Sequence, residues 1–152
     1  MAKGFKFKLQ SVLDLKIKNE DDEKRKLADV MQLQAREEQA LVSLENRRAY
    51  LIAELKKKQG EGAINVVELQ MYSRAIEKLK NDIISQQLRL KEIKIMLDEQ
   101  RNRLLLATQE KKIYEKLKEK QHKAYIEEEE YKDKQTIDEL ATLKFAKPKS
   151  ED

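Results

Sequence analysis

An apolar residue recurs at every seventh position through much of the second half of this chain. A companion series lies three residues further on, which gives the a/d pattern of a coiled coil: one narrow apolar stripe that faces a partner helix. A strict seven-residue repeat also predicts a left-handed supercoil. The predicted coiled-coil core positions are Leu69, Ile76, Ile83, Leu90, Leu97 and Leu104.

Residues that interrupt helices are rare and divide the chain at one place. The sequence has three Gly and one Pro, and two of the glycines, Gly60 and Gly62, lie together. Turns need such residues for their special backbone angles, so this composition argues against sheet proteins and α/β enzymes. We expect Gly60 to end the first helix in the left-handed conformation, and Asn65, with Glu68 three residues later, to cap the second.

These signals predict an all-α fold: a two-helix antiparallel coiled-coil hairpin with an overhanging C-terminal helix, in a single domain. The expected limits are about 11–59 for the first helix, 60–64 for the turn, about 66–144 for the second helix and 146–152 for a short tail. A connection of so few residues makes the helices antiparallel. The matching seam of the first helix contains Leu13, Leu27, Val30, Leu41, Leu44, Leu51 and Leu55. It is interrupted by Glu20, Gln34, Glu37 and Arg48. At the companion positions of the second helix, Gln86 and Gln100 weaken the seam and are candidates for fixing its register.

The two expected helices differ in length. Folding the chain at the glycine pair brings Leu13 opposite the neighbourhood of Lys111, where the strict repeat stops. Beyond about residue 112 the second helix has little of the first left to pack on, and a helix without a buried stripe is only marginally stable. We therefore expect the two chain ends to form a partner-binding arm.

Charge is high but evenly mixed. Lys and Arg number 33 against 29 Asp and Glu, for a net charge of +4, and their interleaving is typical of a solvated helix surface. Between Lys111 and Tyr125, however, Lys predominates, and the acidic run Glu127 to Glu130 follows. Such a step suits docking against a charged partner. A second candidate surface off the seam contains Ile84, Leu88 and Ile95.

We expect no catalytic site, metal site or cofactor. A two-helix hairpin offers no cleft in which catalytic groups converge. The lone His122 lies among lysines and is interpreted as a surface residue, and Gly60 and Gly62 lack the Lys and Ser/Thr of a phosphate-binding loop. The chain has no Cys, and no stretch is apolar enough for a membrane span. We expect neither nucleic-acid binding nor direct membrane insertion.

The most specific signals lie at the chain ends. The opening FKFKLQSVLDLK, a series of Tyr72, Ile76, Leu79 and Ile83 after the glycine turn, and the ending DKQTIDELATLKF resemble the flagellar export protein FliJ family along the whole chain. The most specific block contains Lys134, Gln135, Asp138, Glu139 and Ala141.

This resemblance implies a non-enzymatic stalk, similar to the central stalk of rotary ATPases, in the flagellar type III export apparatus. It implies a cytoplasmic protein associated peripherally with the inner membrane. The implied partners are the hexameric export ATPase, the cytoplasmic domain of the export gate protein and the export chaperones. The implied ATPase-binding residues are Leu9, Leu13, Gln135, Asp138 and Glu139. The implied gate-binding residues are Tyr72, Ala75, Ile76 and Leu79, of which Ala75 is smaller than the aromatic residue sometimes found near that position in the family.

Three other interpretations stay open. One is the equivalent stalk of a virulence type III secretion system. Another is a homo-oligomeric scaffold or chaperone, in which the second helix pairs with copies of itself through Leu117, Ala124 and Tyr131. A DNA-associated coiled coil is the third, and the small net charge disfavours it.

Overall fold

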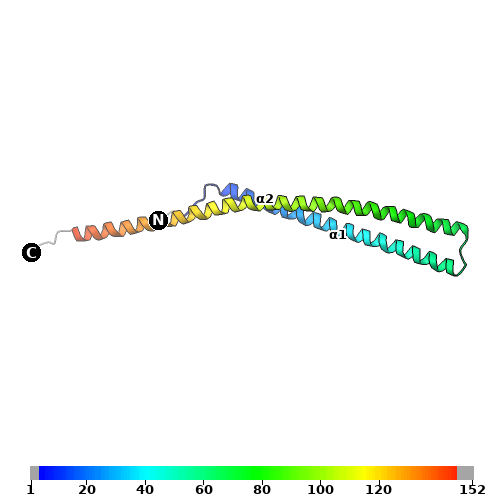
Figure 1. Ribbon diagram of the computed structural model, residues 1–152. Coiled ribbons are helices and arrows are strands. Elements are labelled where there is room, and N and C mark those ends of the chain that lie inside the picture. The colour runs from blue at the N-terminus through cyan, green and yellow to red at the C-terminus, as the bar shows by residue number, and fades with distance from the viewer. Residues whose placement is uncertain (1–3, 147–152) are drawn as a thin grey trace, which may run out of the picture. The chain divides into compact units, whose positions relative to one another are not determined.

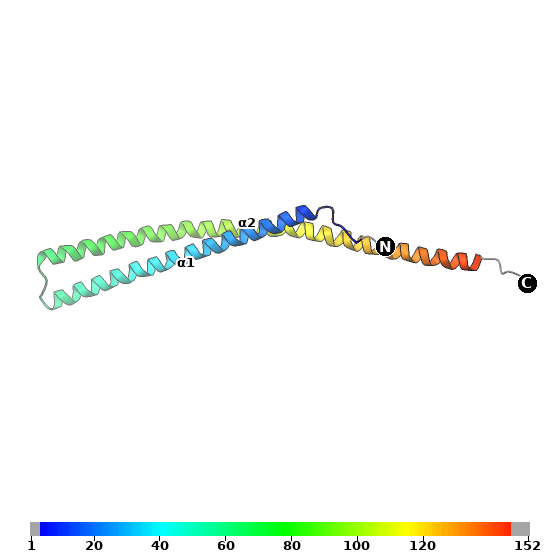
Figure 2. The same ribbon diagram turned by 180° about the vertical axis from the view of Figure 1, so that it is seen from behind.

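The computed structural model describes residues 4–146, and over that range it contains two long helices and no strand. Helix α1 spans Gln10–Gly60 and helix α2 spans Val66–Ala146, and a short loop joins them (Figures 1 and 2). The helices pack against each other antiparallel, which confirms the predicted all-α hairpin. The expected tail at 146–152, with Pro148, lies outside the described residues apart from Ala146.

The chain divides into two compact units. The first, here called the hairpin unit, is Asp21–Leu105. The second, the terminal unit, takes the chain on either side of it, which among the described residues means 4–20 and 106–146. Each unit contains part of α1 and part of α2.

The end of α1 is closed by a Schellman motif. The amide of Ala63 donates to the carbonyl of Lys58 (3.2 Å), and the amide of Gly62 donates to that of Gln59 (3.2 Å), the two bonds that define this cap. Gly62 has φ of 66°, the only positive φ among the described residues, whereas Gly60 is helical. The prediction that Gly60 takes the left-handed conformation is therefore wrong, because the cap forms two residues later.

Helix α2 begins as the sequence predicts. The amide of Glu68 donates to Oδ1 of Asn65 (2.8 Å), so the Asn65 side chain satisfies a backbone donor that the first turn of the helix leaves free. This confirms Asn65 as the N-cap. The loop between Gly60 and Val66 is thus fixed by a cap on each side.

The two glycines should respond oppositely to substitution. We expect Gly62→Ala to destabilise the protein by about 1 kcal/mol, because an L-residue at positive φ is strained. Gly60→Ala should stabilise it by up to about 1 kcal/mol, since alanine is the better helix former. No atom lies within 4 Å of a Cβ added at either position, so a clash with a neighbouring group does not contribute to the difference between the two variants. Urea unfolding of both variants checks this, and the reverse order would place the cap at Gly60.

The hairpin unit is held by the predicted seam. Leu97 is 4% exposed, and the other five predicted core positions of α2 are half-buried. The companion positions Leu79 and Ile93 are buried as well, with Ile93 only 3% exposed. Two helices alone bury a stripe and not a full core, so most seam residues keep some exposure.

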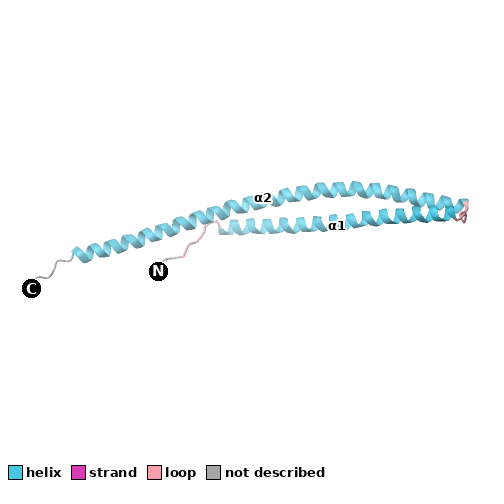
Figure 3. Ribbon diagram, turned by 60° about the horizontal axis from the view of Figure 1, so that its bottom comes forward, coloured by secondary structure: helices cyan, strands magenta, loops and turns pink. Residues whose placement is uncertain are grey.

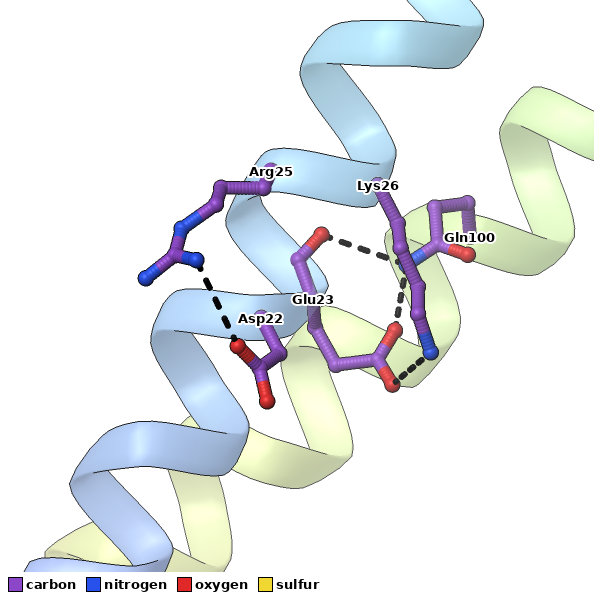
Figure 4. Close-up of polar contacts among 5 residues, drawn as sticks. All are labelled: Asp22, Glu23, Arg25, Lys26 and Gln100. Atoms are coloured by element: carbon purple, nitrogen blue, oxygen red, sulfur yellow. Dashed lines mark hydrogen bonds and ion pairs between the residues drawn. The ribbon is translucent and has the colours of Figure 1, made fainter.

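Two glutamines in this seam bind α1 in the same way. The Nε2 of Gln86 donates to the backbone carbonyl of Glu37 (2.9 Å) and to its carboxylate (2.5 Å). Two heptads further along, Nε2 of Gln100 donates to the carbonyl of Glu23 (3.2 Å) and to its carboxylate (Figure 4). Gln100 is only 6% exposed, yet its amide is satisfied.

These two sets of hydrogen bonds, here called the glutamine clamps, oppose sliding of α1 along α2. If α1 slid by one heptad in either direction, Gln86 would face Val30 or Leu44 in place of Glu37. Val30 and Leu44 offer only a backbone carbonyl, so the amide would lose its charge-assisted bond to the carboxylate, the stronger kind of hydrogen bond. The glutamines that weaken the apolar seam therefore favour one register.

The first clamp also gives the protein an acid-sensitive contact. Hydrogen bonding from Gln86, assisted by the charge of Arg89 (Nε to Oε1 of Glu37, 3.2 Å), lowers the pKa of the Glu37 carboxyl from its ordinary value near 4.5. A lowered folded-state pKa contributes stability above the unfolded value, and this contribution is lost as the pH falls through the folded value.

We therefore predict that the stability difference between wild type and Gln86→Leu changes in favour of the variant as the pH is lowered from 7 towards 3. Thermal unfolding across that range measures it. A constant difference would mean that Gln86 does not act on the ionisation of Glu37. The apolar gain from leucine does not depend on pH, so it leaves this readout unaffected.

Candidate functional site

The described residues form surface grooves and exposed faces to which a partner could bind, and they contain no candidate metal site. Nowhere among them do three His, Cys, Asp or Glu side chains gather so that they can hold a metal ion. Over the same residues, neither helix has a stretch long and apolar enough to cross a membrane. Two surfaces stand out: a groove beside the turn and the C-terminal end of α2.

The first surface is a groove in the hairpin unit, here called the turn groove. Its volume is about 500 Å³. It is lined by Leu51, Lys58, Glu68, Met71, Tyr72 and Ala75. The Nζ of Lys58 lies 5.1 Å from the centre of the Tyr72 ring, a cation–π contact between the two helices. The groove thus combines an apolar lining with one charge of each sign.

The predicted gate-binding residues are divided by their burial. Tyr72 and Ala75 line the turn groove, whereas Ile76 is half-buried in the seam and Leu79 is 7% exposed in the core. Lys58 and Met71 also line the groove and were not predicted from the sequence. Met71 is 66% exposed beside the seam, and Lys58 joins the groove only because the register brings α1 there.

In the terminal unit, the non-helical segment before α1 packs on α2. Phe7 is 7% exposed, and Leu13, in the second turn of α1, is 3% exposed. The Phe5 ring lies 5.0 Å from the ring of His122, edge to face, and 5.6 Å from that of Tyr125. This segment, drawn as a loop in Figure 3, therefore extends the packed region to Tyr125, further than the expected limit near residue 112.

Two ion pairs hold the same region where the apolar repeat fails. Lys111 occupies the next a position of the seam, and its Nζ lies 3.0 Å from a carboxylate oxygen of Glu20, whose side chain is only 4% exposed. Lys16 pairs with Glu110 at 2.9 Å. Hydrogen bonding to these carboxylates raises the pKa of Lys111 and of Lys16 above the ordinary value. The seam thus continues past Leu104 with charged partners.

The second surface is the end of α2, here called the terminal arm, residues 126–145. Every residue from 130 to 145 is exposed, and no other described segment lies beside this end of the helix (Figures 1 and 2). Its exposed large apolar side chains, each above 40% exposure, are Ile126, Tyr131, Ile137, Leu140, Leu143 and Phe145. A helix gains most of its stability in proteins from packing against a neighbour, and no described residue outside α2 packs on this segment.

The predicted ATPase-binding residues do not form one cluster. Gln135, Asp138 and Glu139 line a shallow groove along the terminal arm, with Thr142 and Leu143. Leu13 is a core residue, which lines a hollow with His122, and Leu9 is 38% exposed at the start of α1. At 1.5 Å per residue, His122 and Gln135 are about 20 Å apart along α2, so the arm residues lie well beyond Leu13.

Comparison with known proteins identifies the family. Neither the curated proteins nor the solved structures include a match. The family described as "Flagellar FliJ protein" matches the chain over residues 5–150, which includes both helices and the terminal arm. The chain therefore belongs to the flagellar FliJ family.

Proposed function

We propose that the chain is a non-enzymatic coupling stalk of the flagellar type III protein export apparatus. In this role it binds the hexameric export ATPase through the terminal arm, binds the cytoplasmic domain of the export gate through the turn groove, and assists export chaperones. It works in the cytoplasm, at the inner-membrane export apparatus. The flagellar family supports this proposal over the stalk of a virulence secretion system.

The observation that carries the proposal is the unpaired terminal arm. Its apolar side chains, such as Ile137 (65% exposed) and Phe145 (88% exposed), have no neighbour on any described segment outside α2. Adjacent exposed apolar side chains, such as Ile137 and Leu140 on one face of the arm, are typical of a protein interface. Gln135, Asp138 and Glu139 add polar groups that can orient a partner there.

The proposed mechanism is mechanical and allosteric. A single stalk has no rotational symmetry, so it contacts the subunits of a symmetric ring unequally. Contacts that differ between the conformations of a subunit shift the populations of those conformations. The stalk therefore favours assembly of the ring or changes its rate of ATP hydrolysis.

The direct test adds the purified chain to the purified export ATPase. We expect a complex in size-exclusion chromatography with light scattering, and a changed rate of ATP hydrolysis. If no complex forms and the rate of ATP hydrolysis does not change, the proposed function is contradicted.

The same exposed arm also favours a second candidate, a homo-oligomeric scaffold. Tyr131 and Ala124, which were predicted to pair copies of the second helix, are exposed, whereas Leu117 is half-buried. Light scattering of the chain alone over a wide concentration range separates the two functions. A monomer at all concentrations removes the scaffold.

A further inference from the structure

Four lysines form a stripe along α2 in the terminal unit, here called the lysine stripe: Lys112, Lys116, Lys120 and Lys123. All four are exposed, and none of them forms an ion pair or hydrogen bond with a described residue. Their spacing of four, four and three residues keeps them on one face of a helix. At 1.5 Å per residue, the stripe is about 17 Å long.

This face points away from the rest of the terminal unit. The opposite side of α2 packs on α1 and the segment before it, through Ala107, Lys111, Tyr114 and Leu117, which are buried or half-buried. The centre of the stripe is about half a turn of the helix from the centre of these seam positions. Glu119 borders the stripe, three residues from Lys116 and four from Lys123, and with Glu115 it also lines the hollow beside Leu13. The stripe is therefore a set of positive charges held by a packed helix with no assigned partner.

The charge changes sign immediately beyond the stripe. Glu127 and Glu130 continue the same face of α2 after Lys123, at intervals of four and three residues. A partner of uniform negative charge, such as an anionic bilayer or a nucleic-acid duplex, would meet this acidic band within one or two turns of the helix. A folded protein surface with a short acidic patch avoids that repulsion. Facing like charges raise the free energy of a complex and so disfavour wrong partners.

We propose that the lysine stripe is a docking contact for an acidic patch on a protein partner. This inference rests on the proposed function, under which the patch belongs to the export ATPase. The stripe lies about 20–40 Å along α2 from the arm residues Ile137 and Leu140, so it makes a second contact that steers the approach of the partner. Charge complementarity of this kind acts chiefly on the association rate and on orientation.

The test compares two double variants of the full chain with the same change in net charge. Lys116→Glu with Lys120→Glu reverses the stripe. Lys91→Glu with Lys94→Glu is the matched control, since both lysines are exposed on α2 in the hairpin unit and no ion pair joins them to a described residue. Lys and Glu have similar helix propensities, and circular dichroism checks that both variants keep the helix content of the wild type.

Association with the immobilised export ATPase is then measured at about 50 mM and about 300 mM salt. We expect the stripe variant to associate about tenfold more slowly than wild type at low salt, with a smaller difference at high salt because the charges are screened. The control variant should stay within about twofold of wild type. Equal rates for wild type and the stripe variant would overturn the docking contact while leaving the proposed function in place.

Two further probes distinguish the class of partner. Vesicles with 30% phosphatidylserine and a duplex DNA of random sequence are titrated with wild type and the stripe variant. If wild type binds one of these probes and the stripe variant does not, the proposal of a protein partner is overturned, and the stripe binds that polyanion. If wild type itself fails to bind the ATPase, the proposed function fails and this inference fails with it.

Discussion

Replacing Ile137 and Leu140 by glutamine is expected to weaken binding of the chain to the export ATPase by about thirtyfold or more. Both side chains are more than 60% exposed and lie three residues apart, on the same face of the terminal arm. Central apolar contacts of an interface typically contribute about 2 kcal/mol or more, which corresponds to that change in Kd. Thermal unfolding should not change, because neither residue packs on a described segment.

The matched control is the pair Ile84→Gln and Leu88→Gln, at exposed outer positions of the same helix in the hairpin unit. This pair has the same polarity change and the same good helix former, so only its place differs. We expect ATPase binding within about twofold of wild type. If the control loses binding and the arm variant does not, the ATPase contact lies on the outer face of the hairpin unit and not on the arm.

Replacing Leu97 by alanine is expected to lower the free energy of unfolding by about 2–5 kcal/mol. Leu97 is 4% exposed in the seam, and a leucine-to-alanine change in a packed core loses both buried area and neighbouring contacts. That is a large share of the stability of an ordinary domain. Urea unfolding followed by circular dichroism at 222 nm measures the loss.

Leu88→Ala provides the comparison, because Leu88 is 55% exposed on the same helix. Its expected effect is within about 0.5 kcal/mol, as for most surface substitutions. Similar losses at Leu88 and Leu97 would show that the outer face of α2 is also packed, for example in an oligomer. Such a result would favour the scaffold function.

The fold follows from local signals that are visible in the sequence. A seven-residue repeat has one structural solution, a helix seam, and the exposed fractions from Leu69 to Leu104 follow it. The cap at Asn65 is likewise local, because its side chain reaches only the first turn of its own helix. The choice between Gly60 and Gly62 was wrong because either glycine permits the left-handed conformation, and the cap bonds decide which one adopts it.

The polar residues of the seam were harder to interpret. Glu20, Glu37 and Lys111 look like interruptions of an apolar repeat, yet Glu20 binds Lys111 and Glu37 binds Gln86. These pairings depend on the register between two helices, which no single helix encodes. The packing of Phe5 on His122 depends in the same way on a loop meeting a helix more than a hundred residues later in the sequence.

The candidate surfaces were predicted in part. Tyr72 and Ala75 do line a groove, and Gln135, Asp138 and Glu139 do lie together on an exposed helix. The sequence alone could not show that Leu9 and Leu13 lie apart from these arm residues. Their separation depends on how far the segment before α1 extends along α2, because that segment sets where the terminal arm begins. That segment makes a ring contact with Tyr125, and beyond this residue no described segment packs on the arm.

Amide hydrogen exchange measures whether the terminal arm is unpaired in the isolated chain and is buried by its partner. In the chain alone, amides of residues 130–145 should exchange much faster than those of residues 90–104, because only the latter lie in a packed seam. Addition of the export ATPase should slow exchange in the arm and leave the hairpin unit unchanged. Equal protection of both segments in the chain alone, or an arm that exchanges as fast with the ATPase as without it, would show that the terminal arm is not an unpaired ATPase-binding surface.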